Sequence, residues 1–204
     1  MTERGLRIFG RTAIECSVDS YAVSLADELA ARYSKRFGAA ATPGFVADLF
    51  CGSGNIAYHI GRHLAVPTHA VELDPLIHRA TQHNFSLVEV DIDLVHGDYQ
   101  ELLRTLAPRS PHDIYIIEPP WGPAYTEQGL DLTATSPPVP DILANIRRSR
   151  MGEPFLAVIK TNDQIANNSL RTCFYDAQHL ASIIPAPVGP IGVNMNFYLY
   201  RVLT

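Results

Sequence analysis

Two short segments carry the residues best suited to chemistry. Residues 46–55 read VADLFCGSGN, an apolar run with the carboxylate Asp48 that leads into a glycine turn. A second apolar run, residues 114–117, leads into EPPWG, which brings Glu118, two prolines and the single tryptophan, Trp121, to one place. A glycine turn before a helix lets the backbone and its free N–H groups approach a nucleotide-like cofactor. A carboxylate beside a flat indole suits a planar nitrogenous acceptor.

The glycine turn taken by itself fits two cofactors. From Gly52 to Ala57 the chain matches G-x-G-x-x-A, a nicotinamide-binding pattern, with Glu72 about where a ribose-binding acid belongs. Three features favour S-adenosylmethionine. Asp48 would oppose a pyrophosphate but can accept hydrogen bonds from the cationic amino-acid end of the methyl donor. Asp98 follows the third strand, where it can reach an adenine amino group, and the chain is short for a dehydrogenase. Each acid also has a structural interpretation, as a helix cap or a loop-stabilising group.

The EPPWG segment is suited to holding an amine. Pro119 and Pro120 restrict φ and end the strand, which would aim Glu118 and the Pro119 carbonyl into a crevice. A carboxylate and a carbonyl can orient the lone pair of an amine, and the carboxylate can later take a proton. Trp121 offers a face for stacking, and the alternative is a tryptophan that packs in the core or in a loop.

The elements that must position these residues alternate along the chain. Apolar spacing predicts a helix over residues 19–37, and strands and helices follow one another from residue 45 onward. The predicted strands are residues 46–50, 69–73, 92–96, 114–117, 155–159, a short one at 183–184, and 194–202. The predicted helices are residues 55–64, 75–87, 99–106, 141–150 and 164–174, with Asp74 and Asp141 as N-caps. Residues 119–140 are expected to form a functional loop. Repeated β–α units imply a parallel sheet with helices on both faces, and ligands bind beyond the carboxyl ends of its strands.

The bulk properties restrict the function classes. A chain of 204 residues suits one α/β domain, and a net charge of −5 with a pI near 5.9 disfavours broad nucleic-acid binding. Three scattered cysteines suit a reducing compartment. The charged start of the chain lacks a signal core, and no apolar run is long enough to span a bilayer. We therefore expect a cytoplasmic protein with no membrane partner and no metal, and with His59 and His63 on its surface.

Taken together, DLFCGSGN, VELDP, GDY and EPPW resemble, in their order, the motifs of class I S-adenosylmethionine-dependent methyltransferases over residues 45–203. The resemblance implies a Rossmann-like, doubly wound α/β fold with a seven-stranded sheet, mostly parallel, whose last strand is antiparallel. It implies S-adenosylmethionine as cofactor and Glu118, Pro119, Pro120 and Trp121 as catalytic residues. The implied cofactor-binding residues are Asp48, Phe50, Gly52, Gly54, Asn55, Glu72, Leu73, Asp98, Tyr99 and Glu118.

Within this class, EPPWGPxY is similar to the DPPWGGPxY motif of trimethylguanosine synthase-like enzymes, which methylate the exocyclic amine of a guanine cap. It also resembles the (D/N/S)PP(Y/F/W) motif of amino-directed methyltransferases. Residues 15–19, ECSVD, resemble the segment that covers part of the cofactor in the cap enzymes. Residues 1–44 are therefore expected to be an N-terminal helical extension over the cofactor site, and residues 45–204 the methyltransferase domain. Glu118 departs from the motif, because it reaches one methylene further than Asp.

The acceptor stays open at this point. An RNA nucleobase is one candidate, with Arg147, Arg148 and Arg150 available for phosphates, although these arginines also fit a solvated helix face. A small amine or nitrogen heterocycle of specialised metabolism is the second, with residues 119–140 as a lid. A partner subunit that keeps the fold without catalysis is the third.

Overall fold

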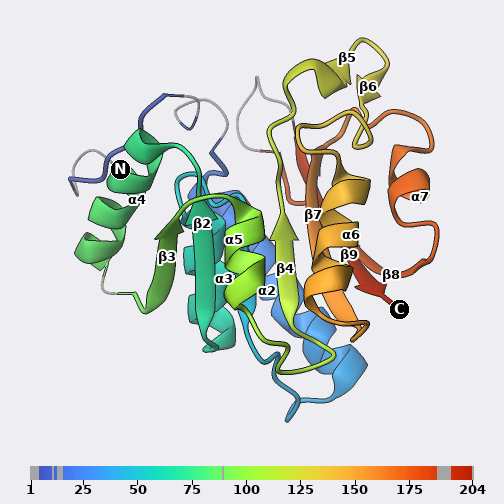
Figure 1. Cartoon of the computed structure of the whole chain (residues 1–204), viewed down its shortest axis with the longest axis horizontal. Coiled ribbons are helices and arrows are strands. Elements are labelled where there is room, and N and C mark those ends of the chain that lie inside the picture. The colour runs from blue at the N-terminus through green and yellow to red at the C-terminus, as the bar shows by residue number, and fades with distance from the viewer. Residues whose placement is uncertain (1–4, 11, 13–15, 89, 188–193, 204) are drawn as a thin grey trace.

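The computed structural model describes residues 5–10, 12, 16–88, 90–187 and 194–203. It shows a sheet with helices on both faces (Figure 1). The helices are α2 (Asp19–Phe37), α3 (Asn55–Leu64), α4 (Pro75–Val88), α5 (Tyr99–Thr105), the 3₁₀ helix η2 (Gly122–Ala124), α6 (Val139–Ser149) and α7 (Ser169–Cys173). The strands are β1 (Val46–Asp48), β2 (Thr68–Glu72), β3 (Ile92–His96), β4 (Ile114–Ile117), β5 (Tyr125–Thr126), β6 (Gly129–Leu130), β7 (Phe155–Asn162), β8 (Ala177–Ile183) and β9 (Met195–Val202).

The main sheet has seven strands in the order β3-β2-β1-β4-β7-β9-β8. The first five run parallel, and β9 lies antiparallel between β7 and β8. The prediction of a seven-stranded α/β sheet with an antiparallel last strand is therefore confirmed. Because β1 and β4 are in direct register, their carboxyl ends meet at one edge of the sheet.

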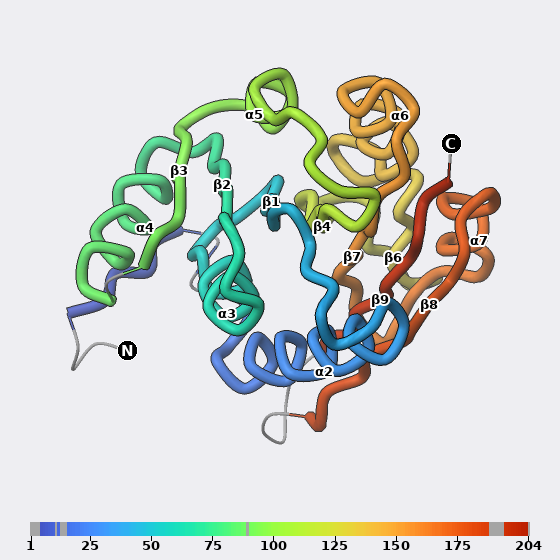
Figure 2. Tube along the Cα trace, turned by 90° about the horizontal axis from the view of Figure 1, so that it is seen from below, coloured from blue at the N-terminus to red at the C-terminus, as the bar shows by residue number. Residues whose placement is uncertain are grey.

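Two helical layers enclose the sheet. Figure 2 shows α5 and α6 on one side of the sheet and α2, α3 and α4 on the other. The eight residues of β7 are all buried and alternate between the two layers. Phe155, Ala157 and Ile159 join the core under α5 and α6, whereas Leu156 and Val158 join the core under α2 and α3. A strand covered on both faces reads as a continuous apolar run, which explains the composition of β4 and of the first five residues of β7.

Three predicted elements differ from the structure. The helix predicted over residues 164–174 is confined to α7, because Asn168 has φ +66° and the residues before it pair with Leu130. The strand predicted at residues 183–184 is the end of β8, an edge strand whose polar residues hide its alternation. The helix expected from Asp141 begins at Val139, so Asp141 lies in its first turn and does not cap it.

Other boundaries follow local chemistry. The predicted cap at Asp74 is confirmed, since its Oδ1 accepts hydrogen bonds from the amides of Leu76 at 2.8 Å and Ile77 at 3.2 Å. Strand β7 continues to Asn162, three residues beyond the predicted end, because all eight of its residues pair with β9. No helix among the described residues combines the length and the apolar character needed to cross a membrane.

Candidate active site

The carboxyl ends of β1, β4 and β7 bring three charged side chains together. Asp48 is the last residue of β1, Glu118 follows the last residue of β4, and Lys160 lies near the end of β7. Side chains alternate along a strand. Residues two positions earlier on these strands (Val46, Ile116 and Val158) all pack on the α2–α3 side. Lys160 forms an ion pair with Glu118. The structure thus places residues 48 and 118 on neighbouring strands at one edge.

Buried carboxylates dominate the charge of this edge. Asp48 and Glu72 are each 2% exposed. Glu72 accepts hydrogen bonds from the amides of Gly52 at 3.0 Å and Asp74 at 2.8 Å. Burial, helped by the negative charges of Glu118 and Glu72, raises the pKa of Asp48 to about 7, while the Phe50 amide and Lys160 act in the opposite direction. A site with more buried carboxylates than cations favours a ligand that carries positive charge.

The glycine turn lies between this edge and helix α4. Gly52 and Gly54 have φ of +52° and +76°, values that favour glycine. The Gly52 carbonyl accepts a hydrogen bond from the Thr81 hydroxyl at 2.6 Å. A Cβ on Gly54 would lie 2.4 Å from the Phe85 ring, so the turn packs directly on α4. Helix α3 begins at Asn55, where the first backbone N–H groups of the helix lack helical partners.

The N-terminal segment passes over the turn. The side-chain Nδ2 of Asn55 donates to the Ser17 carbonyl at 2.7 Å, and the Asn84 side chain exchanges two hydrogen bonds of 2.7 Å with the Arg7 backbone. Cys16 lies within electrostatic reach of Lys160 and Glu118, and burial raises the pKa of its thiol. Glu15, part of the segment that resembles the cofactor cover, lies outside the described residues. These contacts fit the proposed extension over the cofactor site.

Two of the predicted cofactor residues have structural roles in the fold. Asp98 caps α5 by accepting a hydrogen bond from the Gln100 amide at 2.8 Å. Tyr99 is 5% exposed and packs against Phe50, with ring centroids 5.2 Å apart. The Tyr99 hydroxyl accepts a hydrogen bond from Asn145 at 2.6 Å. Contact of Asp98 and Tyr99 with the cofactor stays a prediction.

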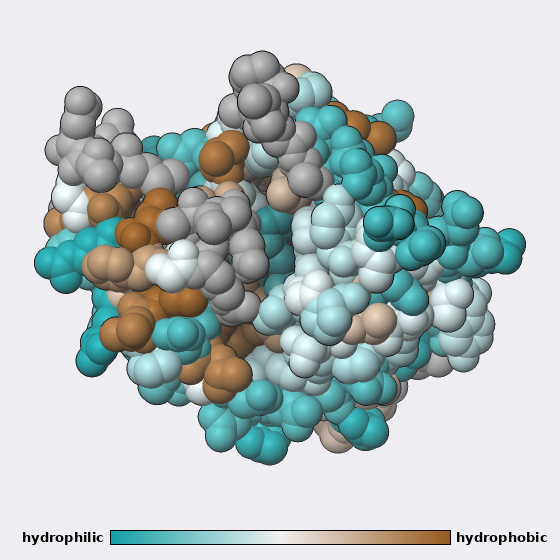
Figure 3. All heavy atoms as spheres, turned by 90° about the horizontal axis from the view of Figure 1, so that it is seen from above, coloured by the Kyte–Doolittle hydropathy of each residue, from teal (hydrophilic) through white to brown (hydrophobic). Residues whose placement is uncertain are grey.

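Apolar and aromatic surface flanks the charged centre. Leu73, directly after Glu72, is 65% exposed. Figure 3 looks onto the carboxyl edge and shows apolar side chains gathered on the left of the view, with paler and hydrophilic ones on the right and a hollow between them. Trp121 is partly buried against the core under α5 and α6, and Tyr125 lies 6.2 Å away between ring centroids. Trp121 thus lies on the α5–α6 side of the same edge.

Two polar residues of β7 escaped the sequence analysis. Lys160 and Asn162 are 1% and 0% exposed. The Asn162 Oδ1 accepts a hydrogen bond from the Gln164 amide at 3.1 Å, but its Nδ2 has no hydrogen-bond partner among the residues that the structure describes. The predicted strand ended at Ile159, before both of them. The signal that would have found them is a lysine and an asparagine spaced two apart, directly after an apolar strand.

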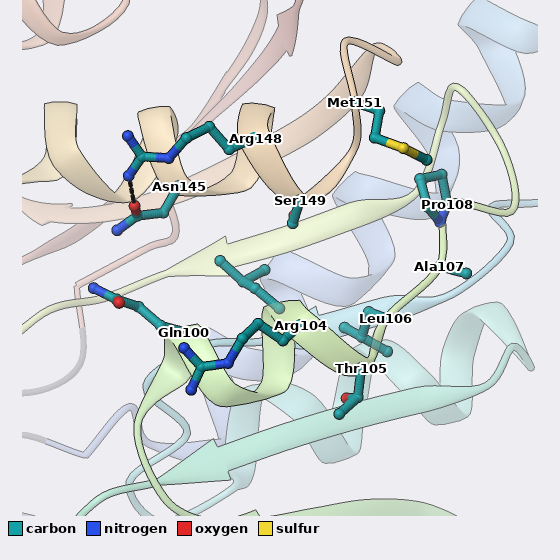
Figure 4. A pocket seen from close by; sticks show the side chains of 11 residues that line it. Gln100, Arg104, Thr105, Leu106, Ala107, Pro108, Asn145, Arg148, Ser149 and Met151 are labelled. Atoms are coloured by element: carbon teal, nitrogen blue, oxygen red, sulfur yellow. Dashed lines mark hydrogen bonds between the residues drawn. The ribbon is translucent and has the colours of Figure 1, made fainter.

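The expected arginine cluster is divided by the fold. Arg150 is completely buried in an ion pair of 2.8 Å with Asp113, so both expectations for it, contact with phosphates and a solvated helix face, are wrong. Arg147 pairs with Asp176 at 2.7 Å. Arg148 is exposed, and with Arg104 it lines a groove of about 550 Å³ between α5 and α6 (Figure 4). In that view Arg148 contacts Asn145, and both arginines extend along the groove.

The described residues include no group of histidines or other metal ligands that forms a second candidate site. His59 and His63 lie 3.7 Å and 3.1 Å from Asp19 and Asp27. In the described part of the chain, no three His, Cys, Asp or Glu side chains are grouped so that they could hold a metal ion.

The residues at the carboxyl edge offer the kinds of contact that S-adenosylmethionine needs. The positive-φ glycine turn leaves backbone N–H groups at the start of α3, Asp48 and Glu72 supply buried negative charge, and Leu73 supplies exposed apolar surface. A nucleoside with a cationic amino-acid end requires these three kinds of contact.

Comparisons with known proteins agree with a site of this kind. A family model described as RNA cap guanine-N2 methyltransferase matches residues 44–146, half of the chain. No curated protein matches the chain in sequence.

Solved structures share the fold. A Listeria monocytogenes protein described as a class I S-adenosylmethionine-dependent methyltransferase has a TM-score of 0.65 at 12% identity, over 95% of this chain and 64% of that one. A Pyrococcus horikoshii protein described as an RNA methyltransferase has a TM-score of 0.54 at 16% identity, over 88% and 84%. A variant of MtNAS solved with S-adenosylmethionine has a TM-score of 0.54 at 14% identity, over 90% and 63%.

Proposed function

We propose that this chain, which belongs to the RNA cap guanine-N2 methyltransferase family, methylates the exocyclic amino group of a planar, guanine-like acceptor. The chain is an S-adenosylmethionine-dependent methyltransferase. One observation supports the proposed acceptor most: Glu118, followed by two prolines and Trp121, lies at the end of β4 beside the buried Asp48 of β1. This arrangement puts a hydrogen-bond acceptor for an amine next to the proposed cofactor residues.

The residues divide the work between donor and acceptor. Asp48, Glu72 and the turn from Gly52 to Gly54 would hold S-adenosylmethionine, which when bound supplies a methyl group on a positively charged sulfur. Glu118 and the Pro119 carbonyl accept hydrogen bonds from the acceptor amine and thereby aim its lone pair. Exchange of an N–H bond for an N–CH₃ bond leaves one proton to be removed, and the Glu118 carboxylate can take it.

Two acceptor classes follow from different observations. The description of the family supports a guanine in RNA, and the groove lined by Arg104 and Arg148 offers positive charge for phosphates. A net charge of −5 and the loss of Arg150 to a buried ion pair favour the second candidate, a small amine or nitrogen heterocycle.

A methyl-transfer screen tests the proposed function. S-adenosylmethionine with a labelled methyl group is incubated with guanine nucleotides, capped RNA, uncapped RNA of the same sequence and small amines. We expect label on an exocyclic nitrogen of guanine. Glu118→Gln should lower kcat by about 100-fold, because the amide neither attracts the amine nor takes its proton. Glu127→Gln, which changes an exposed acid of the same loop, is the matched control.

Two outcomes contradict the proposal. One is label on an oxygen or a carbon of every accepted substrate. The other is unchanged turnover in Glu118→Gln while calorimetry shows normal binding of S-adenosylmethionine.

A further inference from the structure

We infer that Lys160 is a positioning residue of the transfer site, whose ammonium keeps the Glu118 carboxylate ionised and aimed at the acceptor amine. The inference rests on the proposed function, because it assigns Lys160 a role in the same site. No motif pointed to this residue, and it lies outside the part of the chain that the family model matches.

The geometry of β7 makes the pair. Ile117 of β4 and Ile159 of β7 are partners in the sheet, so the next residue of each strand, Glu118 and Lys160, come side by side. The Lys160 ammonium contacts the Glu118 Oε1. The Lys160 side chain is 1% exposed, whereas that of Glu118 is 24% exposed. The lysine therefore lies behind the carboxylate, and the carboxylate faces the open side of the site.

The surrounding charges explain why a cation is needed there. Glu72 on β2 and Glu118 both act electrostatically on Asp48 on β1. Cys16, in the segment before α2, lies within electrostatic reach of both Glu118 and Lys160. A carboxylate among other carboxylates tends to take up a proton. Lys160 opposes that tendency. An ionised carboxylate has only hydrogen-bond acceptors, so it selects an acceptor molecule that presents N–H groups over one that presents a carbonyl.

The pair also accounts for the departure of this chain from the motif. Glu118 has one methylene and one rotatable bond more than the Asp of DPPW, and an unrestrained longer side chain would lose more conformational entropy when it binds. An ion pair with a buried, immobile lysine restricts that freedom in advance. Stability alone does not explain the pair, because apolar residues of similar volume usually stabilise a core as well as a buried ion pair does.

Four variants test the inference: Lys160→Met, Lys160→Arg, Glu118→Gln and the double variant Glu118→Gln/Lys160→Met. We expect Lys160→Met to lower kcat at least about 10-fold, with binding of S-adenosylmethionine within about threefold of wild type. The acid side of its pH–rate profile should move up by about one pH unit, because the carboxylate is protonated more easily without its cation. Lys160→Arg should restore most of the activity. Lys35→Met, which removes an exposed charge at the end of α2, should change nothing.

The double variant separates positioning from folding. It carries no unpaired buried charge from this ion pair, so it should fold even where Lys160→Met does not. Its turnover should equal that of Glu118→Gln within about threefold, since Lys160 acts through Glu118. Turnover at least about 10-fold below Glu118→Gln, or a Lys160→Met profile with an unchanged acid side, overturns the inference.

A spectroscopic measurement keeps this inference distinct from the proposed function. The ¹³C carboxyl resonance that disappears in Glu118→Gln is followed against pH in the wild type and in Lys160→Met. A titration at higher pH in Lys160→Met supports the inference, and an unchanged titration overturns it. Neither result requires an acceptor, so a wild type that methylates nothing in the screen would refute the proposed function alone.

Discussion

Asp48 and Glu72 are acidic side chains that folding removes almost completely from water. Glu72 receives two backbone amides at 3.0 Å and 2.8 Å, whereas Asp48 accepts one, from Phe50, at the longer distance of 3.3 Å. Burial first, and then the negative charges of Glu118 and Glu72, raise the pKa of Asp48 to about 7, and the Phe50 amide only partly offsets them. At neutral pH it therefore changes its charge readily when a cationic ligand arrives.

In the ligand-free protein the free energy of unfolding should fall as the pH rises, and we predict that Asp48→Asn makes this fall smaller. The pKa of Asp48 rises on folding from 3.8 to about 7, so between these values the folded state holds a proton that the unfolded state has released. Stability therefore falls as pH rises through this window, by up to about 1.4 kcal/mol per pH unit. Urea unfolding at pH 5 and pH 8 measures the difference, with Asp93→Asn, an exposed acid, as control.

The same variant should bind S-adenosylmethionine less well. The neutral amide cannot attract the cationic end of the donor, and we expect about a 10-fold loss of affinity at pH 8 by calorimetry.

For the stability prediction, equal slopes of the free energy of unfolding against pH in Asp48→Asn and in the wild type would refute the assignment of the pH dependence to Asp48.

Helices with one buried face and strands that are wholly buried were predictable, because the spacing of their apolar residues can be read from the local sequence. The residue types of α3, β3 and β4 determine their bounds. The acids at the ends of β1 and β2, and the acid directly after β4, were found for the same reason. The length of β7 is not local. Pairing with β9 extends it to Asn162, so Lys160 and Asn162 become buried although their sequence is polar. The site residues were therefore predictable where a local motif marks the end of a strand. They were not predictable where pairing with a strand distant in sequence sets the length of the strand.

At Gly54 we predict that alanine destabilises the protein by about 2–5 kcal/mol. Left-handed backbone costs a non-glycine residue about 1–2 kcal/mol, and a Cβ placed 2.4 Å from the Phe85 ring adds an overpacking cost of about 1–3 kcal/mol. Gly152→Ala is the matched control, since it has φ +92° but nothing within 4 Å of its Cβ, and it should show the backbone cost alone. Urea denaturation measures both. Equal losses would mean that α4 moves aside.

Over the whole molecule, one buried ion pair joins segments distant from the site. Arg150, after α6, donates to Asp113 before β4 at 2.8 Å, and also to the carbonyls of Ser110 at 2.8 Å and Pro154 at 2.7 Å. It thereby connects the start of β4, the end of α6 and the start of β7 at the amino end of the sheet. Its role is structural.

We predict that Arg150→Met lowers the free energy of unfolding by about 3–5 kcal/mol, because Asp113 would be left buried without its cation. Arg147→Met breaks a partly exposed pair with Asp176 and should cost at most about 1 kcal/mol. Turnover per folded molecule should stay unchanged in both. A loss of turnover in fully folded Arg150→Met would show that this arginine acts on the site after all.

Strand β9 is synthesised after both of its neighbours, β7 and β8, yet it lies between them. While a ribosome is still adding the residues before β9, the edge of β7 has unpaired amides and carbonyls, and β8 has no partner in the sheet. The strand that carries Lys160 is thus open to extended segments of other nascent chains during that interval. The pairing of β7 and β8 is therefore complete only after β9 has emerged and occupies the position between them.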